Sequence, residues 1–339
     1  MSGGVDSSTS AWLLKRDGHQ VVGVTLLFHD SPHNAEKVAQ AARVAEKLGI
    51  EHHVVDARER FEHEVERAFA QDAQAGIISN PCVRCSAELK MPLLFEQAGA
   101  FGCERVATGH YAAVTSDAYG VDLLDYQLRA PLDRSKDQTF LLYRLNQEQL
   151  SRLVFPLNAT TKGVVRRMAM QAGLQRLSPL HDGQGIPCFF DDGDAEQWLE
   201  GAGGVEGRPG PIVDLASHER RGSHEGLFRY MPGDVLEDGS CVAAKDLEGN
   251  VLYVGPKQFS TVELVVLEDM HWTSVTPPKK MRSCRARIAY DARPVPAHVL
   301  CTGGGVVVTF TKPVCGVCAG MPVVLYSDDL VLGGGVVAR

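Results

Sequence analysis

The sequence has no long apolar run and no export signal. None of its 339 residues belongs to a stretch of the about 18 consecutive apolar residues that a membrane-spanning helix requires. The N-terminus also lacks a basic segment followed by an apolar one. The nine cysteines are an odd number in a chain without such a signal. This favours the reducing cytoplasm, no membrane partner, and thiols used for chemistry or metal binding.

An excess of positive charge is missing as well. The chain has 34 Lys and Arg residues against 42 Asp and Glu residues, a formal net charge of −8. This excludes a protein that binds nucleic acid over its whole surface and leaves room for one basic face, whose contacts would be strongly salt-dependent. Basic residues gather at 162–167, 220–221 and 279–287. With 44% hydrophobic and 22% charged residues, the composition is that of a globular protein.

The N-terminal motif is the most informative stretch. It reads Ser2-Gly3-Gly4-Val5-Asp6-Ser7-Ser8. Paired glycines allow a tight turn that brings backbone N–H groups to an anion. Ser7, Ser8 and Thr9 suit the start of the helix predicted over 11–16, and a glycine-rich turn before a helix binds phosphate. A Walker A motif is absent. The alternative for the whole loop is a helix cap that binds no ligand. The Asp6 carboxylate either helps to bind magnesium-pyrophosphate or only caps the helix.

Strands alternate with helices through the first 110 residues. We predict buried strands over 20–28, 52–55 and 105–108, and helices over 34–48, 58–74 and 83–98. This order is typical of an open parallel α/β sheet, which binds ligands at the carboxyl ends of its strands. A strand normally precedes such a glycine-rich loop. We therefore expect either that the natural start lies upstream of Met1 or that the sheet lacks a central strand.

After residue 200 the pattern changes from helical to β-rich. Segments 148–154 and 162–172 are predicted helices, and glycine-rich 201–211 is a predicted linker. Strands are expected over 243–246, 251–254, 260–266, 284–289, 305–311 and 322–327. We predict a catalytic α/β domain over 1–200, a small central β-rich domain over 201–262 and a C-terminal barrel-like domain over 263–339.

Five of the nine cysteines stand in positions that suggest chemistry or metal binding. Cys82 and Cys85 make a CxxC at the start of a predicted helix, a place that lowers thiol pKa. Cys188 lies in a loop, and Cys315 and Cys318 make a second CxxC. The gap between the two pairs is far wider than in a zinc ribbon, which disfavours one shared zinc site.

Further motifs follow the first in a fixed order. They are Asn80-Pro81 with Cys85, Ala107 to Tyr111, Lys136-Asp137-Gln138, Gln184 to Phe189 with Cys188, Tyr253 to Pro256 and Leu332 to Gly335. Together they resemble the tRNA-specific 2-thiouridylase family of PP-loop ATP pyrophosphatases, along the whole chain. The resemblance implies a PP-loop domain like that of adenine nucleotide α-hydrolases, a small central domain and a β-barrel that helps to hold tRNA.

The resemblance also implies a reaction. ATP adenylates the C2 oxygen of the wobble uridine of tRNA, and a sulfur nucleophile displaces AMP to give 2-thiouridine. Mg²⁺ shields the phosphates. The sulfur comes from a cysteine desulfurase, a relay protein or free sulfide. The target base has to leave its stack, as bases generally do in enzymes that act on them.

The same resemblance implies roles for single residues. Cys188 would carry a persulfide, and Cys85 would release its sulfur by forming a disulfide with it. The implied ATP-binding residues are Ser2, Gly3, Gly4, Val5, Asp6, Ser7, Leu26 and Gly109. The implied RNA-binding residues are Asn80, Pro81, Cys82, His110, Lys136, Asp137, Gln138 and Tyr290.

The sequence departs from the family pattern at several positions. Cys82 stands where the family often has Asp, and Ala289 and Met321 replace an arginine and a glutamine tied to tRNA contact. Cys82, Cys85 and Cys188 could ligate a 4Fe–4S cluster with one open iron, as in cluster-dependent tRNA thiolases. A persulfide relay and a cluster that binds sulfide therefore both stay open as hypotheses.

Two other functional classes stay open. A PP-loop enzyme that adenylates a different acceptor for attack by ammonia shares the glycine-rich loop but does not need Cys85 or Cys188. A tRNA-binding or metal-binding module with a relic loop predicts no conversion of ATP to AMP.

Overall fold

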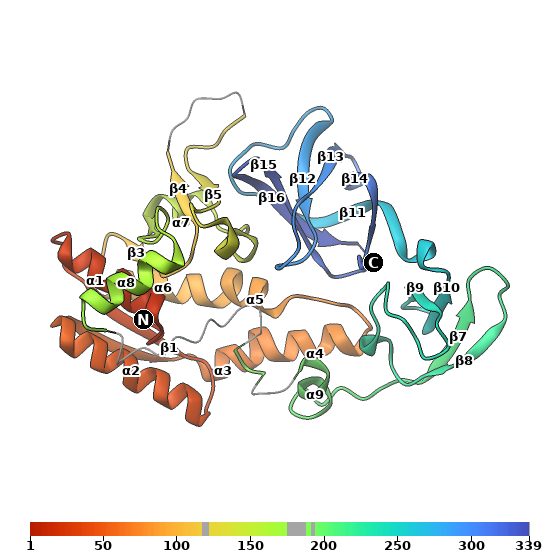
Figure 1. Cartoon of the computed structure of the whole chain (residues 1–339), viewed down its shortest axis with the longest axis horizontal. Coiled ribbons are helices and arrows are strands. Elements are labelled where there is room, and N and C mark those ends of the chain that lie inside the picture. The colour runs from red at the N-terminus through yellow and green to blue at the C-terminus, as the bar shows by residue number, and fades with distance from the viewer. Residues whose placement is uncertain (117–121, 175–187, 191–193, 339) are drawn as a thin grey trace.

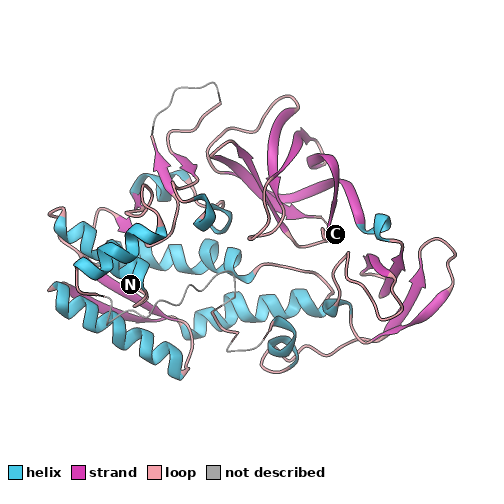
Figure 2. Cartoon of the chain, in the orientation of Figure 1, coloured by secondary structure: helices cyan, strands magenta, loops and turns pink. Residues whose placement is uncertain are grey.

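The computed structural model describes residues 1–116, 122–174, 188–190 and 194–338. Helices gather in the N-terminal half of the chain and strands in the C-terminal half (Figure 2). Within the described residues, no helix combines the length and the apolar character needed to cross a membrane. The fold class expected from the sequence is confirmed: a parallel-sheet domain, a mixed central sheet and an antiparallel barrel.

The N-terminal part contains two short parallel pairs of strands covered by helices (Figure 1). Strand β1 (Val22–Leu27) pairs with β2 (Glu51–Asp56), and β3 (Val106–Ala107) pairs with β6 (Leu153–Val154). The covering helices are α1 (Val5–Arg16), α2 (Pro32–Leu48), α6 (Met91–Ala100), α7 (Gln147–Arg152) and α8 (Lys162–Gln171).

Residue Met1 runs beside β1. Its amino group donates to Val24 O, and its carbonyl accepts a bond from Thr25 Oγ1. Among the described residues, no strand joins the β1–β2 pair to the β3–β6 pair, and the two pairs are separate sheets.

Two predicted helices contain a π-helical stretch. Segment 58–74 consists of α3 (Arg58–Phe61), a π-helix η1 (Glu62–Glu66) and α4 (Arg67–Gln74). The cysteine helix begins at Pro81 as α5 (Pro81–Arg84) and continues as a second π-helix, η2 (Cys85–Lys90), into α6. π-Helical turns are rare and frequently occur at functional sites.

One helix prediction was wrong at its end. The helix expected over 148–154 stops at Arg152, and Leu153 and Val154 form β6 instead. Leu153 is 4% exposed and pairs with Val106. Burial beside β3 therefore outweighs the local helical pattern.

The central part is a four-stranded sheet in the order β8-β7-β10-β9. Its strands are β7 (Gly210–Asp214), β8 (Arg220–His224), β9 (Cys241–Asp246) and β10 (Val251–Gly255). Residues 210 and 211, expected in the linker, begin β7. Helix α9 (Ala195–Glu200) precedes this sheet.

The C-terminal part is a closed six-stranded barrel. Its strands are β11 (Thr261–Trp272), β12 (Arg282–Arg287), β13 (Val295–Thr302), β14 (Gly305–Cys315), β15 (Pro322–Ser327) and β16 (Leu330–Val337). Antiparallel pairing of β16 with β11 closes the barrel. Strands β13 and β16 were not predicted. The hairpin of β4 (Ala113–Thr115) and β5 (Gln127–Arg129) joins β16, so the catalytic part shares a sheet with the barrel.

Candidate active site

The glycine-rich loop turns sharply into α1. Gly3 has a φ of +74°, and an added Cβ there would lie 2.5 Å from Lys37 O, so only glycine fits. Ser7 Oγ accepts a bond from Ser2 N at 3.1 Å and donates to Gly4 O at 3.1 Å. The helix begins at Val5 with Gly4 as its N-cap and no side-chain cap. The expectation that Ser7 starts the helix was therefore wrong. Its hydroxyl braces the turn, which leaves the first N–H groups uncapped for a phosphate.

Gly109 presses against the same loop. A Cβ at this position would lie 2.8 Å from Ser7 N and 3.0 Å from the carbonyl carbon of Asp6. Both are backbone atoms that cannot easily move away. The end of β3 therefore packs directly behind the turn that would hold phosphate.

The Asp6 carboxylate is bonded within the protein. Its Oδ2 accepts from Lys162 Nζ at 2.6 Å, and its Oδ1 accepts from Tyr111 Oη at 3.0 Å. The Lys162 side chain is only 10% exposed. This arrangement ties the loop to α8 and to the segment after β3.

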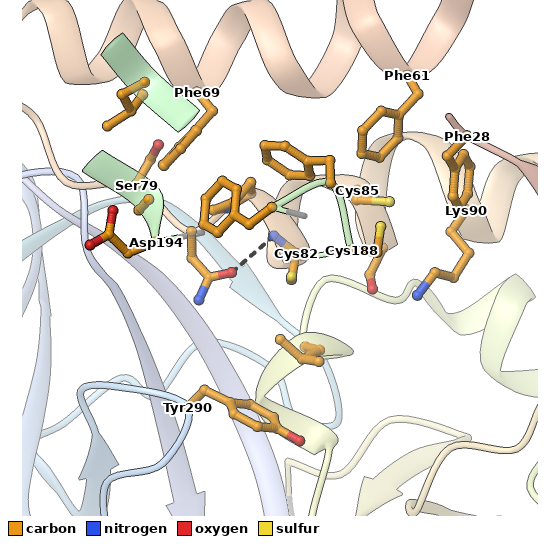
Figure 3. Close-up of a pocket in the computed structure, with 18 of the residues that line it drawn as sticks. Phe28, Phe61, Phe69, Ser79, Cys82, Cys85, Lys90, Cys188, Asp194 and Tyr290 are labelled. Atoms are coloured by element: carbon orange, nitrogen blue, oxygen red, sulfur yellow. Dashed lines mark hydrogen bonds between the residues drawn. The ribbon is translucent and has the colours of Figure 1, made fainter. Parts of the chain in front are cut away.

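Ser2 of this loop lines a pocket of about 730 Å³. Figure 3 shows part of the lining of this pocket. That volume lies within the usual range for a small-ligand site. Ten of the residues predicted for the site line it: Ser2, Leu26, Asn80, Pro81, Cys82, Cys85, His110, Gln138, Cys188 and Tyr290. The pocket brings together residues from both halves of the chain.

Burial makes the thiols of this pocket weaker acids than the sequence suggested. Asn80 is the N-cap of α5, and its Oδ1 accepts from Cys82 N at 3.0 Å and from Val83 N at 3.1 Å. Desolvation raises the pKa of Cys82 to about 12 and that of Cys85 to about 11. Desolvation by the surrounding protein also raises the pKa of Cys188, although part of its side chain stays accessible to solvent. The expectation that the helix start lowers these pKa values was wrong, because desolvation by burial outweighs any effect of the helix start.

Lys90 is the residue that sequence reasoning missed. It lines the pocket and lies at the end of η2, the π-helix that begins at Cys85. In a π-helix, residues five apart lie one turn from each other, so Lys90 and Cys85 face the same side. Its positive charge lowers the pKa of Cys82, Cys85 and Cys188 against the effect of burial. If the segment is taken as an α-helix, Lys90 and Cys85 are not expected to face the same side.

Replacing Lys90 with methionine should slow the alkylation of Cys85 by iodoacetamide at pH 8. Loss of the charge raises the thiol pKa, and only the thiolate reacts. One pKa unit corresponds to about a tenfold change in thiolate at this pH, so we expect a decrease of about three- to tenfold. In the wild type the rate should rise with pH up to about 11, the pKa of Cys85.

The matched control is Lys37→Met. Lys37 lines the same pocket, but its charge lowers the pKa of Cys188 and not that of Cys85. Alkylation of Cys85 should therefore stay at the wild-type rate. Equal rates in all three proteins would show that Lys90 does not act on this thiol.

An aromatic cluster holds the Cys188 segment in place. Phe189 is 6% exposed, and its ring lies 4.7 Å from Trp198, 4.7 Å from Phe190 and 5.5 Å from Phe61, centroid to centroid. Cys188 itself is exposed. The anchored ring thus presents the neighbouring thiol to the pocket. Residues 184–187 of the predicted motif lie outside the described residues.

His110 is neutral in this pocket. Burial, with a smaller contribution from Lys90, lowers its pKa to about 3. Its Nδ1 shares a hydrogen bond of 2.9 Å with Thr108 Oγ1. In the described part of the chain, no three His, Cys, Asp or Glu side chains are arranged to hold a metal ion.

Comparison with known proteins agrees with this geometry. Residues 1–192 match the family model "tRNA methyl transferase HUP domain", and residues 262–337 match "Aminomethyltransferase beta-barrel domain". The tRNA-specific 2-thiouridylase MnmA of Heliobacterium modesticaldum is 37% identical, over 100% of this chain and 91% of its own length. This chain belongs to the MnmA family. The MnmA proteins of Chloroflexus aggregans and Geobacter metallireducens are 36% and 37% identical, over 97% and 94% of their lengths.

A solved structure shows a more distant similarity to this MnmA-family chain. It is the U34-tRNA thiolase NcsA from Methanococcus maripaludis with its [4Fe-4S] cluster, 19% identical, with a TM-score of 0.37 over 56% of this chain and 58% of that one. Nothing about the cysteines of this chain follows from it.

The motif Lys136-Asp137-Gln138 does not enter the pocket as a whole. Only Gln138 lines it. Asp137 Oδ2 faces Arg287 Nη1 of the barrel at 3.4 Å, and Asp137 Oδ1 accepts from Thr139 N at 2.9 Å. Lys136 belongs to a short 3-10 turn, Arg134–Lys136.

Proposed function

We propose that this MnmA-family enzyme thiolates C2 of the wobble uridine of tRNA at the pocket described above. One observation carries the proposal: Cys85 and Cys188, far apart in sequence, line the same pocket as Ser2 of the glycine-rich loop. The two thiols therefore lie next to the loop at which adenylation would take place. The full-length relatives are named as enzymes of this activity.

ATP binds to the N-terminal domain, as its HUP family implies. The uncapped start of α1 would receive the phosphates, and Leu26 at the end of β1 lines the pocket where the nucleotide would lie. Mg²⁺ would neutralise phosphate charge during adenylation. Transfer of AMP to the C2 oxygen turns that oxygen into a good leaving group and releases pyrophosphate.

The sulfur step uses both cysteines. With a persulfide on Cys188, the Cys85 thiolate attacks the Cys188 sulfur, the S–S bond of the persulfide breaks, and hydrosulfide leaves with the electron pair. Hydrosulfide adds to C2, AMP departs, and one proton is lost to give 2-thiouridine. A Cys85–Cys188 disulfide remains, so an external thiol has to reduce it before the next turnover. A desulfurase or a relay protein delivers the sulfane sulfur that loads Cys188, whereas free sulfide, which is already reduced, would attack the adenylated C2 directly.

A resident 4Fe–4S cluster is the second candidate for the sulfur step. The observation in its favour is that Cys82 provides a third thiol in the pocket with Cys85 and Cys188, although in the described residues these thiols are not arranged to hold a metal ion. Iron and acid-labile sulfide measured on anaerobically purified protein decide between the two. If neither iron nor sulfide exceeds background, the cluster is excluded. About four iron and four sulfide ions per chain would support the cluster and contradict the persulfide relay.

Nucleoside mass spectrometry tests the proposed function directly. Anaerobic incubation of the protein with tRNA, ATP, Mg²⁺ and sulfide should give 2-thiouridine only when ATP is present. AMP without 2-thiouridine would indicate another acceptor. The absence of both products would contradict the proposal.

Replacing Asp6 with alanine should reduce AMP formation about a hundredfold and change tRNA affinity by less than about twofold. The carboxylate holds Lys162 and Tyr111 behind the loop, so its loss releases the turn that would receive the phosphates. Lys162→Met, which removes one of these bonds from the other side, should show the same selectivity. Equal losses of AMP formation and tRNA affinity would mean that Asp6 only supports the fold.

A further inference from the structure

Arg287 is a buried cation at the junction of the barrel and the catalytic part. It ends β12 and is 8% exposed, although the sequence groups it with the basic residues at 279–287. Its Nη1 donates to Asp137 Oδ2 at 3.4 Å, and its Nη2 donates to Tyr290 O. The guanidinium lies 5.5 Å from the centroids of the Phe140 and Tyr290 rings. It therefore cannot contact RNA as a surface arginine does.

The contacts of Arg287 continue into the active site. Asp137 is followed directly by Gln138, which lines the pocket together with Tyr290. Gln138 Oε1 accepts from Tyr111 N at 2.8 Å, and Gln138 N donates to Tyr111 O at 3.0 Å. Tyr111 Oη in turn donates to Asp6 Oδ1 in the glycine-rich loop at 3.0 Å. Hydrogen bonds, joined by the Asp137–Gln138 backbone, thus connect a barrel strand to the loop that would hold ATP.

This connection also forms part of the pocket wall. Tyr290 and Gln138 both line the pocket that contains Cys82 and Cys188. In Figure 3 the Tyr290 ring lies across the pocket from Cys82. A shift of Arg287 would therefore move the wall past which a tRNA base has to enter.

We propose that Arg287 is a positioning residue that aligns the tRNA-holding barrel with the adenylation site through Asp137, Tyr290 and Gln138. The inference rests on the proposed function. It assigns Asp137 to this internal connection and not to RNA contact, which is the role that the family resemblance implied. A buried ion pair is a weak source of stability but a strict geometric constraint, because removing one partner strands the other charge.

The junction has other contacts that keep it folded without Arg287. One hydrophobic core contains Phe140 from the catalytic part and Val324, Tyr326 and Val331 from the barrel. Thr139 Oγ1 and Tyr326 Oη also share a hydrogen bond of 3.2 Å. Replacement of Arg287 by methionine, of similar length and without charge, should therefore leave the junction assembled and its alignment loosened.

The test compares Arg287→Met with Arg144→Met. Arg144 Nη1 pairs with Asp269 Oδ2 of the barrel at 2.6 Å, but Arg144 does not line the pocket, so it is a matched control for an ion pair across the same junction. For Arg287→Met we expect kcat/KM for tRNA to fall by about tenfold or more in AMP formation, with the Kd for ATP unchanged within about twofold. For Arg144→Met, both the kcat/KM for tRNA and the Kd for ATP should stay within about twofold of the wild-type values.

Two further measurements distinguish a positioning role of Arg287 from a role in supporting the fold alone. Asp137→Asn should reproduce the defect of Arg287→Met, and the double variant should be no worse than either, because both changes break one connection. Hydrogen exchange of the protein without ligands should quicken at 109–111 and 136–138 in Arg287→Met and not in Arg144→Met. Unchanged exchange there, or equal kinetic losses in the two arginine variants, would overturn the inference. Failure of the wild type to make 2-thiouridine would instead refute the proposed function, and the exchange result would still decide the role of Arg287.

Discussion

Replacing Cys188 with serine should abolish 2-thiouridine formation when a desulfurase with cysteine supplies the sulfur, with a loss of about a thousandfold or more. A serine hydroxyl cannot carry a sulfane sulfur, and Cys188 is the pocket thiol that directly precedes the packed Phe189 ring. Mass spectrometry of nucleosides from treated tRNA measures the loss. Binding of ATP and tRNA should be preserved, because the two side chains differ by one atom.

This variant also separates the proposed function from its rival. An enzyme that adenylates an acceptor for attack by ammonia does not use Cys188 and would keep its activity. Cys301→Ser is the matched control, since Cys301 lies in β13 of the barrel and not in the pocket. Cys82→Ser adds a second distinction. It should leave a persulfide relay largely active, whereas it removes a ligand from a cluster.

Replacing Gly109 with alanine should raise the KM for ATP by about tenfold or more. The new methyl group would lie 2.8 Å from Ser7 N, so the glycine-rich loop has to move away from the end of β3. Overpacking of this kind costs about 1–3 kcal/mol and here falls on the phosphate-binding turn. Initial rates of AMP formation at varied ATP concentration give the KM.

The control for this change is Gly99→Ala. Gly99 lies within α6, and a Cβ there meets nothing within 4 Å. Alanine should therefore be tolerated or slightly stabilising, with an unchanged KM for ATP. An unaltered KM in Gly109→Ala would mean that the loop does not hold the nucleotide in the position proposed here.

Short-range patterns in the sequence were enough to predict several features of this protein. The run from Ser2 to Ser8 predicts a turn and a helix start, because glycine pairs and helix N-termini have local requirements. Alternating strands and helices predicted the parallel α/β part, and period-two segments predicted a β-rich second half. The ordered motifs identified the family, and with it predicted roles for Cys85 and Cys188.

The closure of the barrel required the tertiary structure. The segment Leu330–Val337 contains three successive glycines and lacks a period-two pattern, yet it forms β16 between β15 and β11. Its partners lie far away in the sequence. Pairing between distant strands leaves no local signal when the strand is rich in glycine.

The electrostatics of the site also depended on the tertiary structure. Local sequence placed Cys82 and Cys85 at a helix start and predicted low pKa values, but burial raises both. Lys90 reaches the thiols through a π-helical turn, and Asp137 meets Arg287 from a strand about 150 residues later. Burial and long-range ion pairs arise from how whole elements pack, and a pKa follows its surroundings in space and not its neighbours in sequence.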